Sequence, residues 1–234
     1  MANKNEIDYT RLIKICSITK SNDETILKDC NDKKVLMKNK NEIIYYHNNK
    51  KDNIPLERLK KTRYFYTINN SYREKHNNLN NNKPVVWVLI GKTEEDEVML
   101  QVGRNSSSNN MLKSDIDVDA RYIIEGGDNK YSKLNYEHLT FYQVDINSFI
   151  EEKEQIYAIL NNKYPNDNNL KIAYESIKSA YVEGKVASLY NANLWNPSGG
   201  LDKLFYNYFS NSKKYGKTNF QKDENIWCDY IFIY

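Results

Sequence analysis

The 234-residue sequence has only three cysteines, four prolines and eight glycines. Cys16, Cys30 and Cys228 are an odd number and form no Cys-x-x-Cys pair, which argues against a disulfide framework and against a thiolate zinc site. No apolar run approaches the roughly 18 residues that a membrane-spanning helix needs, and no apolar signal segment is seen near the N-terminus. We therefore expect a cytoplasmic protein without a membrane partner.

Motifs that hold phosphate or metal at a fixed spacing are missing from the sequence. No GxxxxGK[ST] or GxGxxG loop occurs, and His47, His76 and His138 form neither an HxxxH nor an HExxH pattern. A lone histidine is most often a surface or core residue, and His138, at the start of a predicted strand, is the first of the three to test. The sequence predicts no nucleotide cofactor.

Three alternating aspartates, Asp115, Asp117 and Asp119, suggest a calcium-binding loop. An EF-hand loop starting at Asp115 would need glycine at its sixth position and glutamate at its twelfth, where this chain has Ala120 and Gly126. We expect instead that the aspartates form an exposed polar face of a helix or an edge strand.

The composition is that of a folded protein with mild charge. Hydrophobic residues make up 40% and charged residues 28% of the chain, the net charge is +3, and there are 20 tyrosines. A dedicated nucleic-acid binder usually concentrates more positive charge. The abundance of Asn and Lys, as in the run 77–82, is typical of an AT-rich genome and indicates a low-GC bacterium or a mobile element within one.

The distribution of apolar residues predicts an α/β (α+β) fold with a small mixed or antiparallel sheet. A β-rich extension covers 1–50, a helix and an Asn-rich linker cover 55–82, and the main domain covers 83–234. The sheet is centred on a hairpin at 85–103 and is flanked by helices.

The hairpin gives the strongest local signal. Val85–Ile90 is a continuous apolar run, typical of a strand buried on both faces, and a polar turn leads to a second strand that ends at Gly103. Further elements follow from the same patterns: strands near 11–18, 34–37, 42–46, 139–146 and 226–234, and helices from Pro55 to about Lys75, from Asn147 or Ser148 to before Pro165, and over 170–189.

The order hairpin, helix, strand, helix from Val85 to Pro165 resembles the core of the GIY-YIG nuclease family. In that family the two hairpin strands carry Gly-Ile-Tyr and Tyr-Ile-Gly. A helix carries an arginine that neutralises the phosphate, and a later helix carries a glutamate that binds one divalent metal. The resemblance implies metal-dependent hydrolysis of nucleic acid, with Mg²⁺ or Mn²⁺ as the cofactor.

The resemblance assigns candidate site residues. Val85-Val86-Trp87 stands for Gly-Ile-Tyr and Gln101-Val102-Gly103 for Tyr-Ile-Gly, so Gln101 would order water. Glu154 is similar to the metal-binding glutamate, with Glu151 and Glu152 as rivals, and Asn196 to the terminal asparagine. Lys113 or Arg121 would meet the phosphate, because Arg104 comes too early in the chain.

The sequence departs from the family at the reacting groups, and this leaves a second hypothesis open. Trp87 has no hydroxyl, Gln101 cannot act as a phenol, and Lys113 lacks the planar fork of arginine. The first hypothesis is a divergent GIY-YIG-like nuclease of host defence or a mobile element. The alternative is a non-catalytic inhibitor, encoded by a phage or plasmid, that binds a protein partner through a tyrosine-rich surface.

Overall fold

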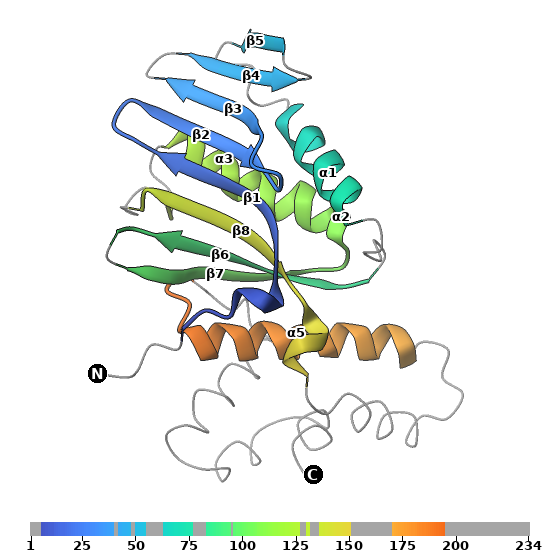
Figure 1. Ribbon diagram of the computed structural model, residues 1–234. Helices are drawn as coiled ribbons and strands as arrows, with labels where there is room; N and C mark the ends of the chain where they lie inside the picture. Colours follow the sequence, from blue (N-terminus) through green and yellow to red (C-terminus); the bar gives the residue numbers. More distant parts are fainter. Residues whose placement is uncertain are drawn as a thin grey trace.

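The computed structural model describes residues 6–39, 42–47, 50–54, 63–76, 83–94, 96–126, 130–131, 136–150 and 170–194, with the backbone alone at 47, 50, 52–54, 63–66 and 170–177. The fold is α+β, as predicted, and is built on one eight-stranded antiparallel sheet in the order β5-β4-β3-β2-β1-β8-β6-β7 (Figure 1). The strands are β1 (Leu12–Lys20), β2 (Glu24–Asp29), β3 (Lys34–Asn39), β4 (Ile43–His47), β5 (Lys50–Ile54), β6 (Val85–Lys92), β7 (Glu97–Asn105) and β8 (His138–Val144).

The N-terminal strands β1–β5 form a meander that continues the sheet of the hairpin β6–β7. The junction is β8, which pairs with β1 on one side and with β6 on the other. In the β1–β8 ladder Leu12 is opposite Val144 and Thr19 is opposite His138. The sheet is therefore larger than the sequence predicts, because the N-terminal strands share one sheet with the hairpin.

The strand β6 is buried on both faces, as its apolar run predicts. From Val85 to Gly91 every residue is buried. Because side chains alternate along a strand, Trp87 and Leu89 enter one core cluster while Val86 and Val88 enter the other. This strand therefore separates the two hydrophobic layers of the protein.

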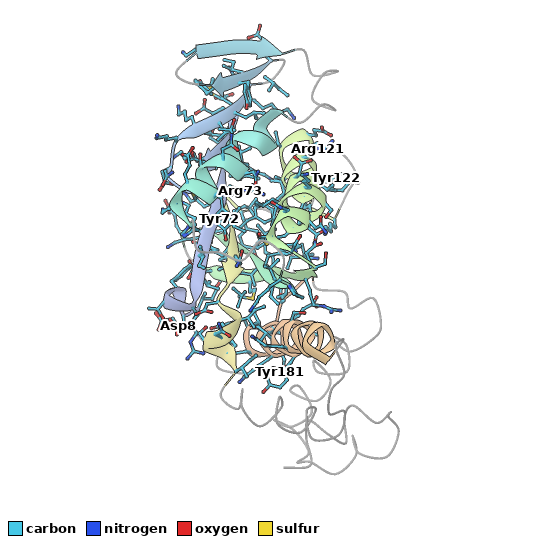
Figure 2. The ribbon with its side chains drawn as sticks, turned by 90° about the vertical axis from the view of Figure 1, so that its right-hand side faces the viewer. Asp8, Tyr72, Arg73, Arg121, Tyr122 and Tyr181 are labelled. Carbon is cyan, nitrogen blue, oxygen red and sulfur yellow. The ribbon has the colours of Figure 1, made fainter. Side chains whose placement is uncertain are left out.

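The first hydrophobic layer lies on one side of the sheet, which we call face A. It is covered by α1 (Arg63–Lys75) and by a continuous helical segment made of α2 (Ser108–Asn110), the π-helix η3 (Met111–Ile116) and α3 (Asp117–Glu125). Figure 2 shows α1 and α3 on the same side of the strands. The C-terminus of α3 is capped by the Lys38 ammonium, which donates to the carbonyls of Ile124 and Glu125 at 2.9 Å each.

The opposite side of the sheet, face B, is covered at the β6–β7 end by α5 (Leu170–Tyr190). Val182 and Val186 of α5 share a core cluster with Val88 and Val102 of the sheet. After α5 the chain turns back along the edge of the sheet, where Leu194 N–H donates to the Leu100 carbonyl of β7 at 2.6 Å. Two short 3₁₀ helices, η1 (Tyr9–Arg11) and η4 (Ile146–Phe149), complete the described elements.

Most predicted elements of the described residues are confirmed. The hairpin, the strands of β1, β3, β4 and β8, and the helix of α5 lie within a few residues of the prediction. The strands β2 and β5 were not predicted. The predicted start of a helix at Pro55, the body of the helix after Asn147 and the strand at 226–234 lie outside the described residues. Among the described helices, none is long and apolar enough to cross a membrane.

We expect Gly103→Ala to destabilise the protein, because the added methyl group would collide with the Trp87 ring. Gly103 is paired with Trp87 across β6–β7, and an added Cβ would lie within 3.0 Å of the indole ring. Overpacking of this kind costs about 1–3 kcal/mol, measured as the change in the free energy of unfolding in urea. In a Trp87→Leu background, which removes the ring atoms Nε1, Cε2 and Cζ2 that would collide, the same substitution should cost clearly less. Equal costs in both backgrounds would contradict this packing.

Candidate functional site

Polar side chains gather on both sides of the β6–β7 hairpin, at the end where β7 leads into α2. On face A, the Asp115 carboxylate accepts hydrogen bonds from Trp87 Nε1–H at 2.9 Å and from Asn105 Nδ2–H at 2.7 Å, both to Oδ2. Asp115 lies in the π-helix η3, a type of helix that is rare and often marks functional sites. The indole of Trp87 therefore donates a hydrogen bond to a carboxylate and packs against Gly103.

The Asp115 carboxyl is an unusual acid. Burial raises its pKa above the ordinary value, and this outweighs the opposite effect of its hydrogen bonds with Trp87 and Asn105. The Asp119 carboxylate raises the pKa further and the Lys130 ammonium lowers it. A carboxyl in such surroundings can exchange a proton at a higher pH than an exposed aspartate.

The expectation that the aspartates form an exposed polar face is wrong. Asp117 is 4% and Asp119 6% exposed, on the first turn of α3, and each has a cationic partner. Asp119 Oδ1 is 3.2 Å from Lys130 Nζ, and Asp117 pairs with Arg121 one helical turn later. The positive charge of each partner compensates the carboxylate, which explains how the two carboxylates are tolerated in the interior.

Arg121, a predicted phosphate-binding residue, is half-buried in α3 and its guanidinium is held by Asp117. Figure 2 shows Arg121 beside the meander, whereas Tyr181 of α5 lies at the other end of the molecule. Lys113 is exposed on η3, and no hydrogen bond or ion pair joins it to another described residue. The structure therefore does not bring Lys113 and Arg121 together with α5.

Gln101, the residue predicted to order water, lies on β7 opposite Leu89, on face A. Its Oε1 is buried and accepts no hydrogen bond from any described residue. Glu154, its rivals Glu151 and Glu152, and Asn196 lie outside the described residues.

On face B the hairpin carries an ion pair that the sequence did not predict. Arg104, next to Gly103 on β7, donates from Nε to Oε2 of Glu183 on α5 at 3.2 Å. The Glu183 side chain is 8% exposed and that of Arg104 is 31% exposed. A carboxylate that is nearly buried therefore holds a guanidinium that reaches solvent.

Glu183 could have been found from the pattern of the predicted helix 170–189. It lies three residues after Ala180 and four before Ala187, and both alanines are fully buried. A carboxylate within the apolar stripe of a helix requires a partner, and this signals either an ion pair or a ligand. The partner itself could not be identified, because Arg104 is 79 residues away in the chain.

The fit of a divalent metal can be judged from the side chains around Glu183. Its Oε2 is already held by a guanidinium, which supplies the compensating charge. Among the residues with described positions, no three His, Cys, Asp or Glu side chains gather where they could ligate an ion. The described residues do not form a site for Mg²⁺ or Mn²⁺ by themselves, and such a site would need ligands from elsewhere in the chain, such as Glu154.

Comparison with known proteins gives no family: no protein-family model matches the chain, and no curated protein or solved structure matches it significantly.

The raised pKa of Asp115 predicts a pH-dependent effect of Asp115→Asn. A carboxyl whose pKa is raised by folding contributes stability that is fully present below its unfolded pKa and is lost as the pH rises through its folded pKa. Asparagine does not ionise and can still accept from Trp87. We therefore expect the free energy of unfolding of the variant, relative to wild type, to improve as the pH rises above about 4, the ordinary pKa of an aspartate.

Asp32→Asn is the matched control for this prediction. Its hydrogen bond with Lys14 lowers the pKa of Asp32, so its contribution is present above the unfolded pKa and is lost on acidification. The relative stability of this variant should worsen as the pH rises toward about 4 and should stay level above it, where that of Asp115→Asn improves. Urea unfolding followed by tryptophan fluorescence measures both, and a shift of the same sign in the two variants would refute the assignment for Asp115.

Proposed function

We propose that this protein is a divergent GIY-YIG-like nucleic-acid-processing protein whose phosphodiester site is the Arg104–Glu183 pair on face B. The observation that carries the proposal is the meeting of these two side chains beside Gly103. They come from the second hairpin strand and from the helix α5, and the resemblance requires a phosphate-binding arginine and a helical glutamate in one site.

The order of the helices and strands along the chain supports the proposal. The hairpin β6–β7, the helical segment 108–125 and the strand β8 follow one another in the order that the resemblance implies, and α5 stands in the place of the helix that the resemblance puts before Pro165. The pairing of β8 with β6 makes these three strands one compact unit. In this arrangement Glu183 takes the role that the sequence assigned to Glu154, and Arg104 takes the role that was assigned to Lys113 or Arg121.

The chemistry of the pair suits an anionic substrate. Because Glu183 holds Arg104 through Nε, the guanidinium is fixed in orientation while part of it remains exposed. A planar guanidinium presents several N–H donors in a geometry that matches a phosphate. Donors fixed in advance stabilise the charge that develops on a phosphate during cleavage. We assign no step to a metal here.

The alternative function, a non-catalytic inhibitor with a tyrosine-rich surface, has less support from the described tyrosines. Tyr45, Tyr72 and Tyr131 are buried, and the exposed large hydrophobic residues of the described part are Tyr9 and Tyr122. These two lie on different elements, η1 and α3, and Figure 2 shows Tyr122 far from Asp8, the neighbour of Tyr9 in the chain. They do not make a continuous patch.

The proposal is tested by incubating the full chain with supercoiled plasmid and with single-stranded RNA, in Mg²⁺, in Mn²⁺ or in EDTA. We expect nicking or cleavage that Glu183→Gln and Arg104→Lys slow by roughly 10²-fold, the usual loss when a fixed transition-state donor is removed. Glu97→Gln is the matched control, because Glu97 is a partly exposed β7 carboxylate that contacts Lys92 and Tyr9 instead.

Folding is checked by the thermal midpoint, since breaking a partly buried ion pair also destabilises. Cleavage by a folded Glu183→Gln at the wild-type rate would refute the assigned pair, and Glu154→Gln then tests the other glutamate. A wild-type chain that neither binds nor cleaves nucleic acid, and that retains one stoichiometric protein from a low-GC bacterial lysate, would establish the alternative.

A further inference from the structure

The face B side of the meander, from β1 to β5, carries a second group of polar and basic side chains. The register fixes its members: Ile26 is opposite Met37 and Met37 opposite Ile44, while Leu27, Leu36 and Tyr45 are turned to the core on face A. Ile26, Met37 and Ile44 are only partly buried although they lie on inner strands. Among the described elements, none packs on this part of face B, which we call the open face (Figure 2).

A row of lysines crosses the open face next to these apolar residues. Lys28 is directly opposite Lys34, and further along the same side Tyr46 is opposite Lys51, whose ammonium lies 6.0 Å from the centre of the tyrosine ring. We call Lys28, Lys34, Tyr46 and Lys51 the basic row. Two like charges directly opposite in a ladder are destabilising, so this pairing costs stability in the absence of an anion.

The charge of the open face is not balanced within the described residues. Lys14 also points to this side, opposite Tyr142, and pairs with Asp32 at 2.5 Å in the turn before β3. The field of Lys28 also lowers the pKa of Asp32. Lys28 and Lys34 form no ion pair with any residue of the described part of the chain. Four lysines therefore face two carboxylates, Asp32 and, at the other end of β2, Glu24, so the surface keeps a net positive charge and is complementary to a polyanion.

We propose that the open face binds single-stranded nucleic acid, with phosphates on the basic row and bases on the apolar row of Ile26, Met37 and Ile44. A single strand offers unstacked bases to an apolar surface and phosphates to lysines, whereas a duplex keeps its bases stacked inside. Tyr46, within the row, provides an aromatic ring for one base. The proposal extends the proposed function, because this surface would hold a strand that continues beyond the Arg104–Glu183 site on the same side of the sheet.

The test measures binding of the full chain to a fluorescein-labelled 12-nucleotide oligothymidine by anisotropy, at several NaCl concentrations. Each phosphate contact to a single strand contributes roughly 0.7 to the slope of log affinity against log salt. Lys28→Gln/Lys34→Gln should therefore lower that slope by roughly 1.4 and weaken binding roughly tenfold or more near 0.1 M salt. Glutamine is polar, retains the first two methylene groups of the side chain and removes the repulsion, so we expect the variant to fold.

The matched control is Arg73→Gln/Lys83→Gln, which removes the same charge from two exposed residues outside the open face. Equal weakening by the two double variants would overturn the inference, because binding would then follow net charge alone. Tighter binding of a 12-base-pair duplex, or full displacement of the oligothymidine by an equal charge of polyglutamate, would also overturn it.

The experiment separates this inference from the proposed function. Arg104→Lys slows cleavage if the proposed function holds, whatever the basic row does. Loss of affinity only in Lys28→Gln/Lys34→Gln supports the open face, and unchanged affinity in this variant, with cleavage still dependent on Arg104, rejects the open face alone.

Discussion

The antiparallel pairing of β1 with β8 is the contact on which the architecture depends. Without it the chain would contain a five-stranded meander and a separate three-stranded unit. With it, the helix α1, which follows the meander, and the segment 108–125, which follows the hairpin, cover one continuous face. The hydrogen bond from the Tyr72 hydroxyl of α1 to Oε1 of Gln143 on β8, 2.8 Å long and buried, joins the two halves again inside that core.

The elements that could be predicted are those in which burial produces a local run or a regular pattern of apolar residues. Val85–Ile90 is apolar at every position because both sides of β6 are covered, and α5 has a clear apolar stripe. The strand β2 has only two adjacent apolar residues, Ile26 and Leu27. The strand β5 is almost entirely polar because it lies at the edge of the sheet. Edge strands of this kind leave little hydrophobic pattern to read.

The candidate site was only partly predictable, for a different reason. The hairpin and Gly103 could be recognised locally, but a site also depends on which distant side chain meets it. Arg104 was set aside for its position in the chain, whereas in space it is adjacent to Glu183. Glu183 is 79 residues further along the chain, and no local sequence pattern predicts such a contact. The burial of Asp119 likewise depends on Lys130, which belongs to a later segment.

The alternation of side chains along β7 divides the polar groups of the hairpin. Gly103 faces Trp87 on face A, and its neighbour Arg104 faces α5 on face B. Trp87 and Asp115 thereby join the π-helix to the sheet, and the proposed site, Arg104 with Glu183, lies on the other side.

The β1–β8 pairing also has a consequence for synthesis of the chain on the ribosome. Thr19 and its partner His138 are separated by 119 residues. At roughly 5–20 residues per second, the edge of β1 waits roughly 6–24 s for β8 to be made. During that time β1 can already be paired with β2, but the backbone groups on its other edge, which includes Cys16 and Ile18, have no partner strand. A nascent chain of this protein thus exposes a strand edge open to pairing with another chain for most of its translation.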